Sequence, residues 1–142
     1  MRNIPDPVTW ALAALLAWPG LAAADDSDQT QFESFVVAAG ASNGAARACG
    51  ASEPDLAEHQ ATARRNLQRY AQEYSLRADG YDALFRQGQG QGKAMMDEMK
   101  QSGVDGCRGV LGSFQHERAI SYEDMKAALA EVSDGLPGEK AP

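Results

Sequence analysis

The chain has 142 residues, a net charge of −7 and only 13 Lys and Arg residues against 20 Asp and Glu. This length allows one compact domain rather than two. The acidic balance argues against nucleic acid and anionic lipid as partners, because both require clustered Lys and Arg.

Residues 1–24 have the features of a signal peptide. Arg2 stands near the start, an apolar run follows over 8–18, and residues 22–24 are all alanine, as signal peptidase prefers. The alternative is a membrane anchor, but a spanning helix needs about 20 apolar residues, and this run is shorter and is interrupted by proline and glycine. We therefore expect cleavage after Ala24, a periplasmic or secreted protein, and no membrane span after cleavage.

Three capping boxes mark helix starts further along the chain. In each, a Ser or Thr precedes an acidic residue by three positions, so that side chains can satisfy the first backbone N–H groups. The boxes open at Thr30, Ser52 and Ser121. Together with apolar residues at three- and four-residue steps, they predict five helices, over about 30–49, 52–77, 81–102, 105–114 and 121–132.

No strand is expected, because alternating runs of Val, Ile, Thr and aromatic residues are missing. The predicted fold is therefore an all-α, small helical bundle of about five helices that forms a single domain over 25–134. The segment 135–142 contains two prolines and two glycines, and we expect it to be a disordered tail.

The domain contains two cysteines, Cys49 and Cys107. An exported protein passes through an oxidising compartment, where two thiols normally pair. The alternative is a pair of reactive or metal-binding thiols, but the chain has no Cys-x-x-Cys motif, and neither cysteine has a histidine within four residues. We expect a structural disulfide, which should stabilise the fold by about 4 kcal/mol in the chain-entropy model.

The stretch FRQGQGQGK at 85–93 raises the question of a phosphate-binding loop. Such a loop needs a preceding strand and the spacing G-x-x-x-x-G-K-[ST], and neither is present. Three glycines cost a helix roughly 3 kcal/mol relative to alanine, so a break is one interpretation. The apolar positions before and after the glycines nevertheless stay in helical phase. We therefore predict one continuous helix, with Gly88 and Gly92 facing a neighbouring helix and Gly90 facing outward.

Four methionines, at positions 95, 96, 99 and 125, suggest copper, because thioethers select Cu(I). Core packing is the simpler interpretation at this helical spacing. His59 and His116 each stand beside a glutamate, but neither pair matches the metalloprotease motif H-E-x-x-H, and both are expected on the surface. The pattern therefore predicts no catalytic residues, no cofactor and no metal site.

The layout of signal peptide, helices, two spaced cysteines and acidic surface resembles that of small helical periplasmic proteins of bacteria. Immunity proteins that neutralise wall-degrading toxins are among them. No motif can be matched residue by residue, so this resemblance implies no site. The function we expect is that of an exported, non-enzymatic protein that binds another protein with a basic surface, an inhibitor or immunity protein being one form. The alternatives are a periplasmic copper-binding protein that uses the methionines, and an enzyme or lytic factor whose site is assembled only in the fold.

A contact surface for the partner is predicted at the turn between the second and third helices. Tyr74, Tyr81 and Asp82 lie there, and tyrosine offers contact area at small entropic cost. The alternative is that the tyrosines belong to the core, since Tyr74 continues an apolar stripe.

Overall fold

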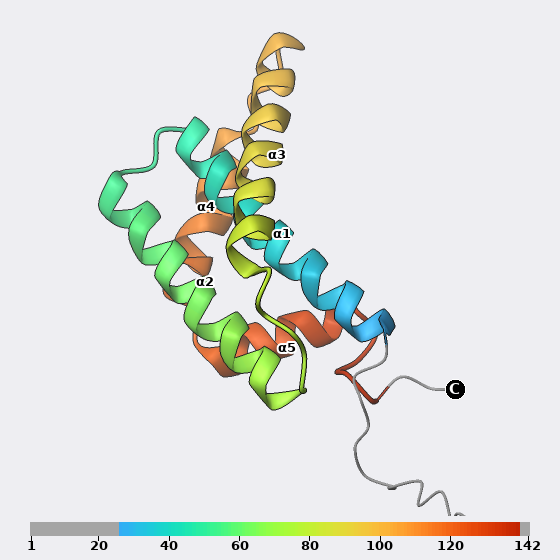
Figure 1. The fold of residues 1–142 in the computed structure, drawn as a ribbon. Helices are drawn as coiled ribbons and strands as arrows, with labels where there is room; N and C mark the ends of the chain where they lie inside the picture. Colours follow the sequence, from blue (N-terminus) through green and yellow to red (C-terminus); the bar gives the residue numbers. More distant parts are fainter. Residues whose placement is uncertain (1–25, 140–142) are drawn as a thin grey trace, which may run out of the picture.

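The computed structural model describes residues 26–139, so the signal peptide expected at 1–24 and the last residues of the expected tail lie outside the described residues. Within 26–139 the chain forms five helices and no strand, which confirms the all-α prediction. The helices are α1 (Asp26–Ala48), α2 (Glu53–Glu73), α3 (Tyr81–Gln101), α4 (Cys107–Glu117) and α5 (Tyr122–Val132) (Figure 1). Within 26–139, none of the helices combines the length and the hydropathy that a membrane span requires.

Helices α1 and α3 cross at the centre of the molecule and make its closest packing (Figure 1). The predicted continuous helix is confirmed, because α3 runs through all three glycines. A Cβ atom on Gly88 would lie 2.0 Å from the Val37 carbonyl oxygen, and one on Gly92 would lie 2.0 Å from that of Ala41. Gly90 has nothing within 4 Å of its Cβ position, as expected for the outer face.

The α1 side of this crossing is also built from glycine. A Cβ atom on Gly40 would lie 2.0 Å from the Phe85 carbonyl oxygen, and one on Gly44 would lie 2.1 Å from that of Gln89. Each helix thus contributes a pair of glycines four residues apart. The missing side chains let the two backbones touch, which no other residue type would permit.

The predicted caps hold for two helices and fail for the first. The side chains of Ser52 and Ser121 accept hydrogen bonds from the backbone N–H groups of the residues three positions later. The first helix, however, begins at Asp26, so the expected start at Thr30 is wrong; the Thr30 hydroxyl donates to the Asp26 carbonyl at 2.9 Å within the helix. The acidic residues Asp26 and Asp28 occupy the true first turn, where they complement the helix dipole.

Helix α2 ends at Glu73, four residues before the expected end at Arg77. Ser75 adopts a positive φ of 54°, and the Leu76 N–H bonds the Ala71 carbonyl at 2.8 Å. This is a Schellman termination in which a residue other than glycine takes the left-handed position. Burial of Leu76 in the main core, at 9% exposure, stabilises the strained residue that precedes it.

The predicted disulfide between Cys49 and Cys107 is present, with the two Cα atoms 5.3 Å apart and a sequence separation of 58. It joins the C-terminal end of α1 to the first residue of α4. Helix α4 needs this link, because Phe114 is its only fully buried side chain and packs into a small second core with Ala46 and Leu56.

The main core lies at the other end of α1, where α1, α2, α3 and α5 meet. It is built on aromatic rings that include Phe32, Phe35 and Tyr70. Beyond α5 the chain continues in turns, and Leu136 packs against this core. Between the main core and the small second core, α1 and α2 carry polar side chains that are fully buried.

Candidate functional site

The three residues predicted to bind a partner have different environments. Tyr81 is 2% exposed, and its ring lies 6.0 Å from that of Phe85, so this side chain belongs to the core. Burial raises the pKa of its hydroxyl and outweighs the opposing effect of Arg64, and the hydroxyl has no hydrogen-bond partner among the described residues. Asp82 is exposed and bound to Arg64, whereas Tyr74 is half-buried beside Tyr70. Binding of a partner at this corner stays a prediction.

The most distinctive polar cluster involves a residue that the sequence placed wrongly. His59 was expected on the surface, but it is 2% exposed, and its ring lies 4.9 Å from that of Phe114. The reason is its helical phase, because His59 stands three residues after Leu56 and four before Ala63, on the buried side of α2. His116, by contrast, is exposed as expected.

Asn43 of α1 determines how His59 is bonded. The Asn43 Nδ2 atom donates to the Leu56 carbonyl oxygen at 3.2 Å and lies 3.1 Å from His59 Nδ1. A carbonyl oxygen only accepts, so the contact with Leu56 fixes the orientation of the amide, and His59 Nδ1 must accept as well. The Asn43 Oδ1 atom accepts in turn from Gln89 of α3 at 3.0 Å.

The proton of the imidazole is therefore on Nε2, which donates to Glu117 Oε2 at 3.2 Å. Both ring nitrogens of His59 are used within the fold. The chain of hydrogen bonds runs from Gln89 of α3 through Asn43 of α1 and His59 of α2 to Glu117 at the end of α4. Four helices thus meet in one buried polar chain, which fixes their relative positions.

Glu117 is the exposed end of this chain. Its Oε2 atom also accepts from the Ser42 hydroxyl at 2.7 Å, and its side chain is 40% exposed. Burial acts to raise the pKa of Glu117, but the hydrogen bonds from His59 and Ser42 outweigh it and hold that pKa below the ordinary glutamate value. The carboxylate is therefore ionised at neutral pH. Among the described residues no hydrogen-bond donor reaches its second oxygen, Oε1.

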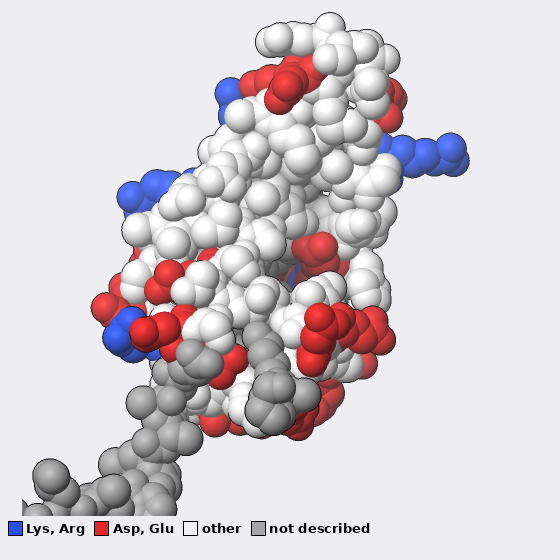
Figure 2. Space-filling view, turned by 90° about the vertical axis from the view of Figure 1, so that its right-hand side faces the viewer, with Lys and Arg blue, Asp and Glu red and all other residues white. Residues whose placement is uncertain are grey.

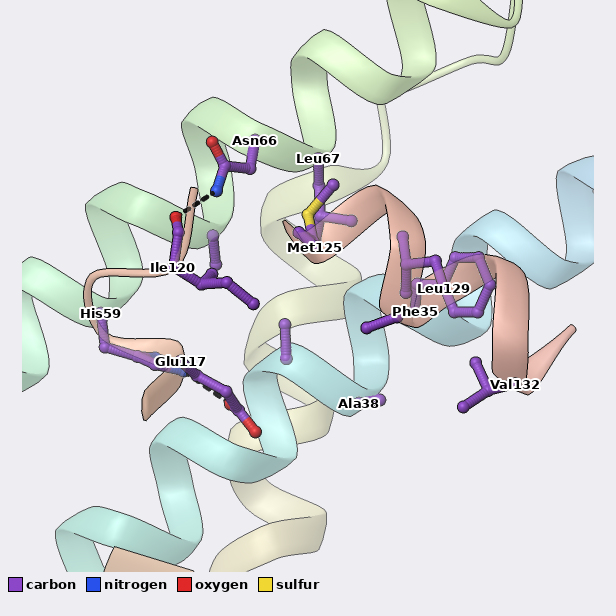
Figure 3. Close-up of a pocket in the computed structure, with 13 residues that line it drawn as sticks. Phe35, Ala38, His59, Asn66, Leu67, Glu117, Ile120, Met125, Leu129 and Val132 are labelled. Carbon is purple, nitrogen blue, oxygen red and sulfur yellow. Dashed lines mark hydrogen bonds and ion pairs between the residues drawn. The ribbon is translucent and has the colours of Figure 1, made fainter. Parts of the chain in front are cut away.

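Glu117 and His59 form one end of an open cavity of about 270 Å³ (Figure 3). Apart from Asn66, the rest of the wall is apolar and comes mainly from α1, α2 and α5, with Phe35, Leu129 and Val132 toward the opposite end. Asn66 donates to the Ile120 carbonyl at 3.0 Å and so holds the α4–α5 connection against α2. Among the described residues no Lys or Arg lines the cavity, and Glu117 is its only acidic wall residue.

A second set of polar contacts holds α5 in place as one side of this cavity. The Tyr122 hydroxyl and the Lys126 ammonium of α5 both donate to the carboxylate of Glu73 on α2. The bond from Lys126, followed by that from Tyr122, lowers the pKa of Glu73. The guanidinium of Arg69 lies 3.9 Å from the centre of the Tyr122 ring. These contacts position α5 and leave the cavity open.

The methionines are divided between packing and solvent. Met96 is 6% exposed and Met125 is 9% exposed, whereas Met95 on the other side of α3 is 48% exposed. The terminal carbon of Met99 lies against Gly106, where a Cβ atom would be 2.5 Å away. The described residues contain no group of three His, Cys, Asp or Glu side chains placed to hold a metal ion.

Comparison of this chain with known protein families, with curated proteins and with solved structures finds no match. The site is therefore interpreted from its own geometry. A buried series of hydrogen bonds ends in one ionised carboxylate, that of Glu117. This carboxylate faces an apolar cavity that is open to solvent.

Proposed function

We propose that this chain is an exported, non-enzymatic protein that acts by binding another protein with a basic surface. An inhibitor or immunity protein is one form of such a function. The observation that carries the proposal is the open cavity at Glu117. A concave apolar site with a single charged group is suited to receive a side chain of a partner, because apolar contact supplies affinity and the charge supplies selectivity.

The bonding of His59 supports a binding role over acid–base catalysis. A general base needs a ring nitrogen that is free to take a proton from a substrate. In this fold Nδ1 accepts from Asn43 and Nε2 donates to Glu117, so neither nitrogen is available without breaking a buried hydrogen bond. The histidine therefore serves to position the carboxylate.

The charge distribution supports a basic partner. On the face shown in Figure 2, acidic side chains gather toward the lower end and basic side chains are few there. The net charge of −7 adds a long-range attraction for a basic protein. Export is supported by the features of residues 1–24 and by the Cys49–Cys107 disulfide, which persists in oxidising compartments.

The test is capture of partners by the tagged, full-length chain from the exported fraction of its native host, followed by mass spectrometry. Any captured protein is then purified, and its binding is measured by calorimetry at low and high salt. The proposal predicts a basic partner whose affinity falls as salt rises. A chain found only inside the cell, or captured proteins that do not bind when purified, would contradict it.

Glu117→Gln and Glu123→Gln are a matched pair for that binding measurement. Both remove one negative charge, but Glu123 lies at the exposed start of α5 and does not line the cavity. If the cavity receives the partner, the first variant weakens binding by about tenfold or more, as expected for a lost charged hydrogen bond. The second variant changes affinity only slightly.

A further inference from the structure

Resting on the proposed function, we infer that the cavity at Glu117 is a binding site for an alkylammonium group, which a partner presents as a lysine side chain. The ammonium binds Glu117 Oε1, and the methylene chain lies along the apolar wall formed by α1 and α5. The inference specifies the chemical group that the site recognises and the order of preference among related groups.

The charge of the site selects a cation. The carboxylate of Glu117 is fixed by bonds from His59 and Ser42, both to Oε2, and within residues 26–139 no Lys or Arg lines the cavity to neutralise it. An anion placed there would meet an uncompensated negative charge beside an apolar wall. A cation instead gains a charge-assisted hydrogen bond in a partly desolvated position, where such bonds are strong.

The geometry favours an ammonium over a guanidinium. A guanidinium binds a carboxylate best through two parallel N–H···O bonds, one to each oxygen. Here Oε2 already accepts from Ser42 and from His59, so its two lone pairs are used. Only Oε1 is left, and a compact ammonium can bind one oxygen without loss, whereas a guanidinium loses its second bond.

The shape of the cavity suits an unbranched alkyl chain. Its volume of about 270 Å³ extends from Glu117 toward Phe35, Leu129 and Val132, and the wall between them is apolar (Figure 3). Val132 is 74% exposed, and an occupant would remove part of this apolar surface from water. Lysine carries its charge on four methylene groups, and these groups pack well on apolar surface.

The experiment uses small probes, so that it does not depend on finding the partner. Hexylamine, hexylguanidine and hexanoate are titrated into the purified disulfide-bonded protein, and binding is followed by calorimetry and by chemical shifts of the residues that line the cavity. We expect hexylamine to bind, hexylguanidine to bind more weakly and hexanoate not to bind. Butylamine has two methylene groups fewer and should bind about 16-fold more weakly than hexylamine, at about fourfold for each methylene lost.

Two variants locate the site, and one serves as the control. Glu117→Gln should weaken hexylamine binding by about tenfold or more. Ala128→Phe adds a ring to an exposed lining position of α5 and should block binding without touching the polar chain. Glu123→Gln should bind as the wild type does. Melting temperatures of all three establish that each variant is folded.

The outcomes separate the inference from the proposed function. Equal binding of hexylguanidine and hexylamine, binding of hexanoate, or full binding by Ala128→Phe would each overturn the inference while leaving partner binding intact. Selective hexylamine binding that depends on Glu117 supports the inference. If no protein partner is captured in that case, the proposed function fails while the inference stands. A partner that binds equally well after acetylation of its lysines contradicts the inference and leaves the proposed function standing.

Discussion

The contact between α1 and α3 allows the sharpest prediction about the fold. Substituting Gly88 by alanine adds one Cβ atom at a position 2.0 Å from the Val37 carbonyl oxygen, 2.8 Å from the Ala41 nitrogen and 2.9 Å from the Val37 carbonyl carbon. All three atoms belong to backbone, so no side-chain rotation can relieve the clash. The two helices must move apart by about 1 Å or more to restore an ordinary contact, and interiors are too closely packed to absorb such a shift freely.

The magnitude follows from the cost of overpacking, which is typically 1–3 kcal/mol, and a backbone clash belongs at about 3 kcal/mol or above. For a domain of this size about 1 kcal/mol corresponds to roughly 4 °C, so the melting temperature should fall by about 12 °C. Gly90→Ala, two residues away on the same helix, meets nothing within 4 Å and should stabilise the protein by up to about 1 kcal/mol.

The assay is thermal unfolding followed by circular dichroism, with urea unfolding as the second measure of free energy. If Gly88→Ala and Gly90→Ala give the same melting temperature, the two helices are not in backbone contact and the reasoning fails. A large loss for Gly90→Ala would instead mean that residues 88–92 form a loop.

Three further predictions concern the disulfide and two side chains. Reduction of Cys49–Cys107 should lower the melting temperature by many degrees because α4 loses its link to α1, and thiol labelling of the unreduced, denatured protein should find no free cysteine; two labelled thiols would contradict this. Tyr81→Phe removes a buried hydroxyl without a partner, so urea unfolding should show unchanged or greater stability, and a loss above about 1 kcal/mol would show that the hydroxyl is bonded. Folding lowers the pKa of Glu117, so its ionised carboxylate stabilises the folded protein. This contribution to stability is complete above the ordinary glutamate pKa of 4.5, and it is lost as the pH falls through the lower pKa of the folded state. Between pH 7 and pH 3, the free energy of urea unfolding should thus fall less for Glu117→Gln than for the wild type. An equal fall would show that the pKa of Glu117 is not lowered on folding.

The sequence predicted the helices well because their signals are local. Capping serines, helical spacing of apolar residues and the phase across the glycines all act within a few turns, and they placed Gly88 and Gly92 on the buried face. The same reasoning did not find Gly40 and Gly44, although they show the same four-residue spacing. Which helix packs against α3 is a tertiary fact, and no local pattern in α3 encodes it.

The candidate site was missed for a related reason. Its residues come from four helices, and each looks ordinary in its own segment. His59 stands beside Glu58 in a charged stretch, so its neighbours suggested the surface. His59 nevertheless lies on the same helix face as Leu56 and Ala63, which indicates burial. In the same way, Asn43 lies on one face with Ala39 and Ala46. Polar residues on an apolar stripe therefore gave the one available indication of a buried cluster.

The exposed tyrosine surface expected at the α2–α3 turn shows how far such reasoning extends. Of the two tyrosines predicted there, Tyr81 is buried in the core, and Tyr74, which continues the apolar stripe of α2, is half-buried. The stripe could not show that Arg64 lies over the Tyr81 ring, with its charge bound to Asp82, because these contacts join separate helices.

The most direct test of the central claim, that the cavity at Glu117 is a binding site for an alkylammonium group, is a crystal structure of the protein grown with hexylamine. The account predicts electron density for the amine between α1 and α5, with its nitrogen at hydrogen-bond distance from Glu117 Oε1 and its chain against Phe35 and Leu129. An empty cavity at saturating hexylamine, or an amine bound only elsewhere on the surface, would contradict the account.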